Sequence, residues 1–311
     1  MNSFIYSSDN KRYHTFNYAS RKRYNTKVFK VGLNAGFTCP NRDGKCGHGG
    51  CSFCNDIGSG DFQGNTQLNL MEQFEKGVKI QQNKWPDAKA IAYFQAFTNT
   101  YAPVEQLKEL YDPFIHHPDV IALAIATRVD CLDESIIQYL DSLTVIKDVY
   151  LELGLQSIHD KTAKDMNRGY DYSLFKEVFK RLKSTNLKLI VHVMNGYPTE
   201  TVEQMIETVK EVGQLRPYGI KIHMLNVLKN SNLGMRYSIK PFKLLTLEEY
   251  IDCVITQLRY IPKEVSILRL TGDYSHEDLI EPQWIKNKIM VLNGIDKKMA
   301  LMNVTQGDLC E

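Results

Sequence analysis

The sequence predicts an α/β protein whose core is an open, partial barrel of six strand–helix units. Six short apolar runs rich in β-branched residues recur at 28–34, 90–95, 120–126, 149–154, 188–194 and 219–225. A helical pattern separates each run from the next, and such repetition builds a parallel sheet with right-handed crossovers. Six units fall short of the eight of a closed barrel, so the expected architecture is a partial (β/α)6 TIM-like barrel.

The connecting helices follow from the spacing of apolar residues along the chain. Periodic apolar positions predict helices over about 70–78, 104–115, 134–143, 159–166, 172–184 and 200–215. After residue 240 the rhythm changes to a helix at 246–260, a strand-like run at 265–270 and a tail. We therefore divide the chain into an N-terminal arm (1–27), a barrel core (28–240) and an extension packed on the core (241–311).

Composition excludes several classes of protein. The 311 residues are 43% hydrophobic and carry a net charge of +2, so the chain has enough apolar surface for a core and is no polycation. No apolar run reaches 18 residues, and the polar start lacks the apolar stretch of a signal peptide. The sequence therefore predicts a cytoplasmic protein without a membrane span.

The arm carries charge that the average hides. Residues 1–30 hold seven basic side chains and one acidic side chain, a net charge of +6, interleaved with five aromatic residues. Basic groups attract phosphates and aromatic faces stack on unpaired bases, which favours a nucleic-acid partner. An arm packed on the barrel through its aromatic residues is the structural alternative.

Four of the seven cysteines fall in the Gly-rich loop that follows the first strand: Cys39, Cys46, Cys51 and Cys54. The spacing alone permits a four-thiolate zinc site, a redox pair at 51–54, or an iron–sulfur cluster held by three thiolates. The loop follows the C-terminal end of a barrel strand, where such folds place their chemistry. This position favours the cluster.

The loop, with Phe53 directly before its last cysteine, resembles that of radical S-adenosylmethionine enzymes. More narrowly, GLNAGFTCPNRDG…GGCSFCN resembles the bacterial YhcC/YtqA group, in the branch that includes the catalytic subunit of Elongator. Eleven residues separate Cys39 from Cys51, and a long first gap is a feature of that branch. The resemblance continues in order, over about 28–275, through FQAFTNTYAP (94–103), ATRVDCL (126–132), LELGLQS (151–157), MNRGYD (166–171), NGYPTET (195–201), KIHMLNVLKNSNL (221–233) and RLTGDY (269–274).

The resemblance implies two cofactors, a [4Fe–4S] cluster and S-adenosylmethionine. Cys39, Cys51 and Cys54 would hold three irons, and the fourth iron would bind the amino and carboxylate groups of S-adenosylmethionine. Reductive cleavage would give methionine and a 5′-deoxyadenosyl radical, with a donor such as flavodoxin or ferredoxin supplying the electron. Cys46 matches no ligand position and receives no role.

Polar residues at the strand ends are the expected cofactor contacts. Each has a structural alternative: helix capping for the residues before 104, an ion pair for Arg128 with Asp130, a surface ion pair for Arg168, and a satisfied core position for the strand histidines. Asp273 is polar and follows a glycine, without a partner that the sequence identifies. The candidates are Gln95, Thr98, Asn99, Arg128, Asp130, Glu152, Gln156, Arg168, Gly196 and His223.

The substrate is implied by the relatives rather than by the residues. The resemblance implies tRNA, with a 5-substituted wobble uridine whose carboxymethylaminomethyl group is converted towards aminomethyl. Two alternatives stay open at this point. One is a radical enzyme acting on a small metabolite or a protein, and the other is a zinc-stapled nucleic-acid-binding protein without catalysis.

Overall fold

Seven parallel strands form one curled sheet in the computed structural model, which describes residues 4–55, 58, 67–272 and 277–310. The strand order is β1-β2-β3-β4-β5-β6-β8, so each strand pairs with the one before it in the barrel. This confirms the predicted partial barrel. The strands are β1 (Val28–Leu33), β2 (Lys89–Phe94), β3 (Val120–Thr127), β4 (Asp148–Gln156), β5 (Lys188–Asn195), β6 (Gly219–Met224) and β8 (Ser266–Arg269).

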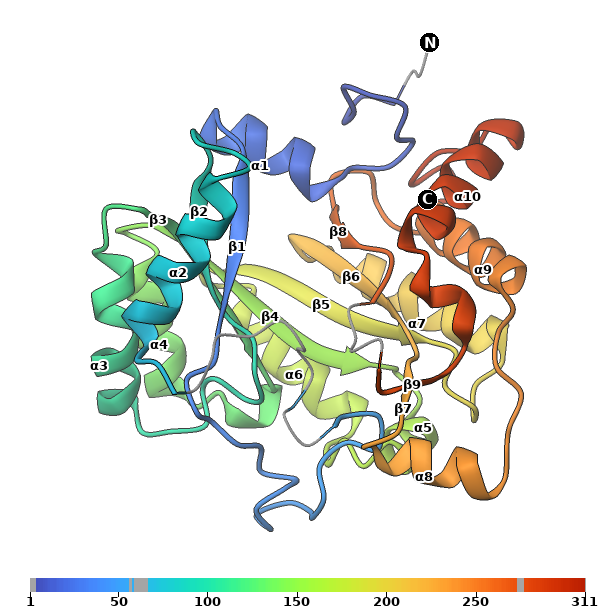
Figure 1. Ribbon diagram of the computed structural model, residues 1–311, viewed down its shortest axis with the longest axis horizontal. Coiled ribbons are helices and arrows are strands. Elements are labelled where there is room, and N and C mark those ends of the chain that lie inside the picture. The colour runs from blue at the N-terminus through green and yellow to red at the C-terminus, as the bar shows by residue number, and fades with distance from the viewer. Residues whose placement is uncertain (1–3, 56–57, 59–66, 273–276, 311) are drawn as a thin grey trace.

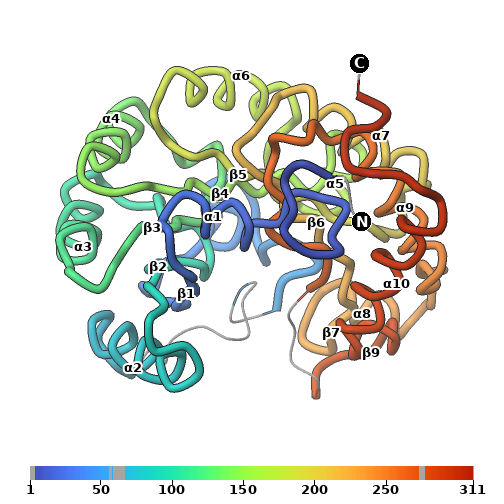
Figure 2. Tube along the Cα trace, turned by 90° about the horizontal axis from the view of Figure 1, so that it is seen from above, coloured from blue at the N-terminus to red at the C-terminus, as the bar shows by residue number. Residues whose placement is uncertain are grey.

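The sheet curls into a half-barrel with helices on its outer side (Figures 1 and 2). An apolar core fills the space between sheet and helices, and a smaller cluster that includes Ile91, Tyr150 and Ile190 lies on the inner face. Both faces are thus covered, which explains why the strands read as continuous apolar runs. The outer helices are α2 (Leu70–Gln82), α3 (Val104–Ile115), α4 (Glu134–Leu143), α5 (Asp160–Asp165), α6 (Tyr172–Leu182) and α7 (Val202–Gln214).

The seventh strand comes from the segment predicted to be an extension. β8 pairs in parallel with β6, and α9 (Leu247–Arg259) between them packs against α7 and α10 (Lys288–Leu301). A short antiparallel pair, β7 (Val227–Leu228) with β9 (Leu279–Glu281), flanks α8 (Asn232–Ile239). The region after 240 therefore completes the sheet. Among the helices that the structure describes, none is long and apolar enough to cross a membrane.

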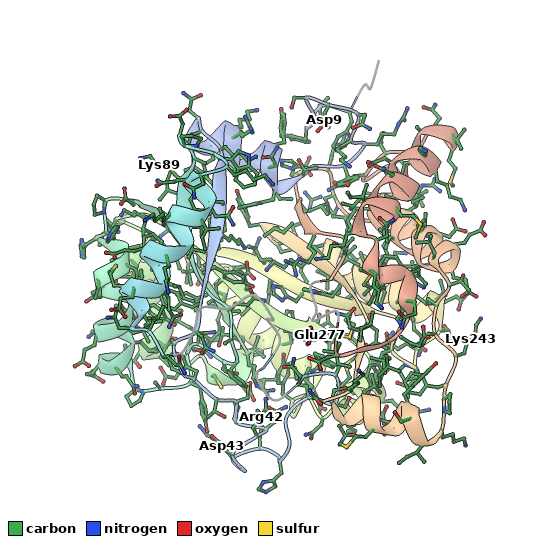
Figure 3. The ribbon with its side chains drawn as sticks, in the orientation of Figure 1. Asp9, Arg42, Asp43, Lys89, Lys243 and Glu277 are labelled. Atoms are coloured by element: carbon green, nitrogen blue, oxygen red, sulfur yellow. The ribbon has the colours of Figure 1, made fainter. Side chains whose placement is uncertain are left out.

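The N-terminal arm forms helix α1 (Phe16–Tyr24), which lies across the N-terminal ends of the strands (Figures 1 and 2). Thr15 caps this helix by accepting a hydrogen bond from the amide of Tyr18. The ring of Phe16 packs edge-to-face on Tyr150 of β4, with centroids 5.7 Å apart. The arm thus packs on the barrel through aromatic side chains and closes this end. Figure 3 shows Asp9 at the arm's end of the molecule and Arg42 and Asp43 at the other.

Candidate active site

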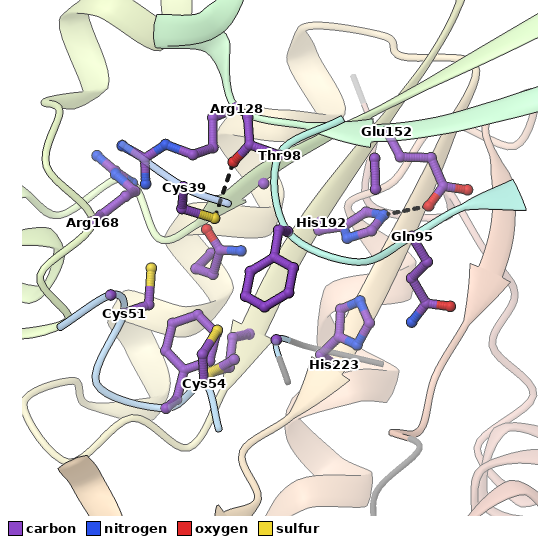
Figure 4. A pocket seen from close by; sticks show the side chains of 18 of the residues that line it. Cys39, Cys51, Cys54, Gln95, Thr98, Arg128, Glu152, Arg168, His192 and His223 are labelled. Atoms are coloured by element: carbon purple, nitrogen blue, oxygen red, sulfur yellow. Dashed lines mark hydrogen bonds and ion pairs between the residues drawn. The ribbon is translucent and has the colours of Figure 1, made fainter. Parts of the chain in front are cut away.

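The three predicted ligand cysteines line one cavity at the C-terminal end of the barrel strands (Figure 4). Cys39 lies directly after β1, and its sulfur accepts a hydrogen bond from Thr98 Oγ1 at 3.1 Å. Cys51 and Cys54 share a tight turn, in which the amide of Cys54 donates to the carbonyl of Cys51 at 3.0 Å. Cys46 is exposed and does not line this cavity; its sulfur lies 4.0 Å from Asp130 Oδ2.

The cysteine loop is held in place by the segment that follows α5. Asn167 donates from its side-chain amide to the carbonyls of His48 and Gly50 at 2.9 and 2.7 Å. Ser52 donates its backbone amide to the carbonyl of Met166 at 2.9 Å. Asn41 Nδ2 reaches both the sulfur of Cys51, at 3.3 Å, and the carbonyl of Asn167, at 2.7 Å. These hydrogen bonds tie the described part of the cysteine loop to Met166 and Asn167.

The surroundings of the three thiols favour a thiolate at Cys51 but not at Cys39 or Cys54. The pKa of Cys51 is lowered to about 6, because the Cys54 thiol hydrogen-bonds to it and Arg128 lies close by. Burial raises the pKa of Cys39 despite the hydrogen bond from Thr98, and the shared hydrogen bond raises that of Cys54. Cationic and N–H groups next to cysteine sulfurs are typical of sites that stabilise thiolate ligands of iron.

Two strand ends beside the loop carry unusual backbone geometry. Phe97, after β2, has φ 59°, and Gln156, at the end of β4, has φ 62°. The β4–β5 register also shifts between Gly154 and Gln156. Left-handed non-glycine residues and irregular strand ends cost free energy and concentrate at functional sites, where they turn a side chain toward a ligand. Both residues line the cavity.

A charged network lies deeper in the same cavity, on the inner face of the sheet. The carboxylate of Glu152 is fully buried and accepts hydrogen bonds from Tyr93 at 2.7 Å and Lys30 at 2.5 Å. It also contacts Lys221, and His192 Nε2 at 2.9 Å. Burial alone would raise the pKa of Glu152, but the two ammonium groups and His192 bring it well below its usual range.

Most of the predicted cofactor residues line the cavity; three do not. Asn99 directs its amide to the backbone carbonyls of Ala96 and Ala126. Asp130 pairs with Arg128, at 2.7 and 2.9 Å, and Gly196 lies instead beside Leu225 and Leu245. Those in the lining are Gln95, Thr98, Arg128, Glu152, Gln156, Arg168 and His223.

The structure also rules out two of the structural alternatives that the sequence left open. Capping of α3 by Thr98 or Asn99 is wrong, since Pro103 begins that helix without a side-chain cap. Arg168 is no surface residue: its guanidinium is buried and donates to the carbonyls of Leu155 and Ser157 at 2.6 Å. Asp273 lies outside the described residues.

Three residues that line the cavity were not among the predicted site residues. Lys221 and Tyr93 received no role, and His192 was passed over in favour of His223. The signal was present, because Lys221 is a charged residue in the middle of an apolar strand, as Glu152 is. Buried charges in strands are costly unless paired, so two of them in one barrel predict a contact.

Comparison with known proteins agrees with this geometry. The family model described as the radical SAM superfamily matches residues 41–212, and that of the radical SAM C-terminal domain matches 217–300. The chain belongs to the radical S-adenosylmethionine superfamily. The cofactors of this enzyme superfamily, a [4Fe–4S] cluster and S-adenosylmethionine, are therefore those of this protein.

The relatives place the chain more narrowly within this superfamily. It is 43% identical to "Uncharacterized protein YtqA" of Bacillus subtilis over 98% of this chain and 95% of that protein. "Protein YhcC" of Escherichia coli is 34% identical over 89% of this chain and 88% of its own length. The fold resembles that of the archaeal Elp3 of Methanocaldococcus infernus, with a TM-score of 0.67 at 19% identity, over 90% of this chain and 64% of that one. This radical SAM enzyme is thus a member of the YhcC/YtqA group, related in fold to Elp3.

The residues present fit the cofactors. Three thiols face one cavity, and hydrogen-bond donors and two guanidinium groups lie around them, which suits an anionic cluster. Among the described residues, no three His, Cys, Asp or Glu side chains are close enough to hold a single metal ion. The four-thiolate zinc site would also require Cys46, which lies outside the cavity.

Proposed function

We propose that this radical SAM enzyme acts on tRNA and converts the 5-carboxymethylaminomethyl group of a wobble uridine to an aminomethyl group. In this proposal Cys39, Cys51 and Cys54 hold the cluster. The seven predicted residues in the cavity lining contact S-adenosylmethionine or the substrate. The observation that carries the proposal is the meeting, in one cavity, of three thiols and a set of polar side chains from six strands or strand ends, β2 to β6 and β8.

The reaction balances without a further oxidant. When bound, the cofactors would supply a 5′-deoxyadenosyl radical able to take a hydrogen atom from the carbon between the side-chain nitrogen and the carboxylate. The substrate radical would then return one electron to the oxidised cluster and lose a proton to water, which gives an imine, and water would cleave the C=N bond to the aminomethyl uridine and glyoxylate. The two electrons that the substrate loses equal those taken up when S-adenosylmethionine becomes methionine and 5′-deoxyadenosine.

Two observations support an RNA substrate. The fold likeness to Elp3 extends over nine tenths of this chain, and the resemblance of the sequence motifs is to the same branch. The cavity opens at the loop end of the barrel, where an unpaired base turned out of an anticodon loop can enter. The enzyme would act in the cytoplasm with a flavodoxin or ferredoxin as reductant.

The first experiment tests the cysteine ligands. The anaerobically reconstituted protein is mixed with S-adenosylmethionine and dithionite, and 5′-deoxyadenosine is measured by mass spectrometry. Wild type and Cys46→Ala should form it, and the Cys39→Ala, Cys51→Ala, Cys54→Ala triple variant should not. Product formation by the triple variant, or zinc in place of iron and sulfide in the wild type, would refute the assignment.

The second experiment tests the substrate. Nucleosides from the tRNA of a deletion strain are compared with those of the parent by mass spectrometry. The deletion should accumulate 5-carboxymethylaminomethyluridine at the expense of the aminomethyl form. An unchanged profile, together with cofactor cleavage in vitro, would point to a small metabolite or a protein as the substrate.

A further inference from the structure

The floor of the cavity is the part lined by Glu152, His192, Lys221 and His223, and among the residues that the structure describes two lysines share its one carboxylate. One carboxylate, that of Glu152, is shared by the ammonium groups of Lys30 and Lys221. Lys221 is 5% exposed on its side chain, and Lys30 is 22% exposed. Arg269 lines the same cavity. Buried charges are stable when paired, so the excess of cations favours an additional anion at this place.

The two neighbouring histidines add no charge to the floor. His192 and His223 face each other with ring centroids 5.1 Å apart. Burial lowers the pKa of both, that of His192 to about 4, so they are neutral at physiological pH. His223 Nε2 is buried and has no hydrogen-bond partner among the described residues. It lines the cavity and offers a polar atom to whatever binds there.

The floor and the three thiols line different parts of one cavity. The same cavity is lined by the three cysteines and by Lys221 and His223. In the view of Figure 4, Glu152 and His192 lie on the side away from Cys51. A group that reaches the floor therefore passes the place where the cofactors are held, so a substrate can extend its end to Lys221 while an earlier atom faces the radical.

We propose that Lys221 and His223, supported by Lys30 and Glu152, bind a carboxylate at the end of the substrate. This inference rests on the proposed function for the identity of that substrate, whose side chain ends in a carboxylate next to the carbon that loses hydrogen. The product has lost this carboxylate and with it the contact to the floor. The same site would therefore select the substrate and release the product.

Protonation of Lys221 links this binding to pH. Burial lowers the pKa of Lys221 well below its usual range, although Glu152 opposes the shift. The charged groups around it are Glu152, Lys30 and Arg269, and the two histidines are neutral. A bound carboxylate opposes this shift and stabilises the ammonium form, so binding should weaken as the pH rises and Lys221 loses its proton.

The first test compares two RNA substrates. Anticodon stem-loops carry either the 5-carboxymethylaminomethyl uridine or its glycinamide analogue, which has the same shape without the charge. We expect wild type to prefer the carboxylate by roughly tenfold or more in kcat/KM, and Lys221→Met to lose that preference. Lys188→Met is the matched control: Lys188 is also a strand lysine paired with a carboxylate, Asp148 at 3.4 Å, but does not line the cavity.

The outcomes separate the inference from the proposed function. If wild type reacts but shows equal kcat/KM for both RNAs, or if Lys221→Met keeps the preference, the carboxylate site is refuted and the reaction stands. Lys221→Arg, which restores the charge, should recover the preference. This recovery excludes a loss of folding as the cause.

A second test does not depend on RNA. Formate is titrated into the reconstituted, histidine-15N-labelled enzyme with S-adenosylmethionine present to fill the cofactor site. Saturable shifts of the His192 and His223 ring signals in wild type and Lys188→Met, but not in Lys221→Met, support the anion site even if no RNA reacts. The absence of saturable shifts in wild type, or their persistence in Lys221→Met, would overturn it.

Discussion

Two carboxylates on strand β4 make the same kind of contacts, one at the N-terminal end of the strand and one in its middle. Asp148 and Glu152 lie four residues apart, so both side chains project from the same face of the sheet. Asp148 contacts Arg23 and Lys188 and accepts a hydrogen bond from Tyr24 at 2.6 Å. Glu152 contacts Lys30 and Lys221, with Tyr93 in the place of Tyr24.

The difference lies in what surrounds each carboxylate. Helix α1 supplies Arg23 and Tyr24 and covers Asp148, which is not part of the cavity lining. The partners of Glu152 come from strands, and the cavity remains beside them. A buried, paired carboxylate therefore does not mark a functional site by itself. The open space next to it distinguishes the site, and the following predictions test this distinction.

The largest expected effect is at the thiols. Replacing Cys39 with Ala removes a proposed cluster ligand, and we expect a loss of 5′-deoxyadenosine formation of roughly 1,000-fold or more, since the cofactor carries the chemistry. Asp148→Asn at the closed end should change the rate less than about twofold, because it touches no cavity residue. Iron and sulfide analysis of both variants checks this. A Cys39→Ala protein with full iron and full turnover would contradict it.

The next effect is the stability lost when either carboxylate is neutralised. Glu152→Gln leaves two buried ammonium groups without a counter-charge, which we expect to cost about 3 to 5 kcal/mol of unfolding free energy. Asp148→Asn should cost less, about 1 to 2 kcal/mol, because its partner Arg23 is nearly half exposed and solvent screens the charge. Urea unfolding measures both values. An equal loss of unfolding free energy in the two variants would contradict the expectation that neutralising the carboxylate beside the cavity costs more.

The pH dependence of stability gives a smaller and more specific effect. Burial would raise the pKa of Asp148, but hydrogen bonds from Arg23 and Tyr24 bring it below its ordinary value. A carboxylate whose pKa is lowered by folding adds stability above its unfolded pKa and loses it as the pH falls through the folded pKa. Arg23→Met should therefore cost about 1 kcal/mol at pH 7, and this difference should shrink below about pH 4. A difference that does not depend on pH would show that Arg23 acts through packing alone.

The barrel and the thiol site could be predicted to a large extent from the sequence, for physical reasons that differ. Strongly periodic helices were placed well, and Val104–Ile115 and Glu134–Leu143 have the predicted bounds. The ligand cysteines were found because spacing and position after a strand are local properties. Helices α1, α8 and α10 were not predicted, since their apolar residues are irregularly spaced and tertiary contacts decide their structure.

The floor of the cavity could not be assembled from the sequence. Glu152 was singled out as a charge in an apolar strand, but its partners Lys30 and Lys221 are 122 and 69 residues away. Only the curl of the sheet brings side chains from β1 and β6 together with Glu152 of β4 on the inner face. The +6 charge of residues 1–30 could not be placed for a related reason, because the sequence does not show at which end of the barrel this segment lies.

The smallest expected effect is that of replacing the exposed basic residues of α1. It tests most directly how the two ends of the barrel differ. Arg21 and Lys22 are exposed and lie on helix α1 at the N-terminal end of the strands (Figure 1), whereas the three cysteines that line the cavity lie in the loop at the other end. Replacing both with Ala should therefore change the KM for an anticodon stem-loop by less than about twofold, because a phosphate contact needs proximity to the bound RNA. Replacing Arg42 of the cysteine loop, which is half-exposed and lines the cavity, with Ala should raise that KM by about three- to tenfold. A strong effect of the α1 variant on full-length tRNA, but not on the stem-loop, would mean that the closed end holds a remote part of the same RNA. In that case the two ends of the barrel would differ in which part of the RNA they bind.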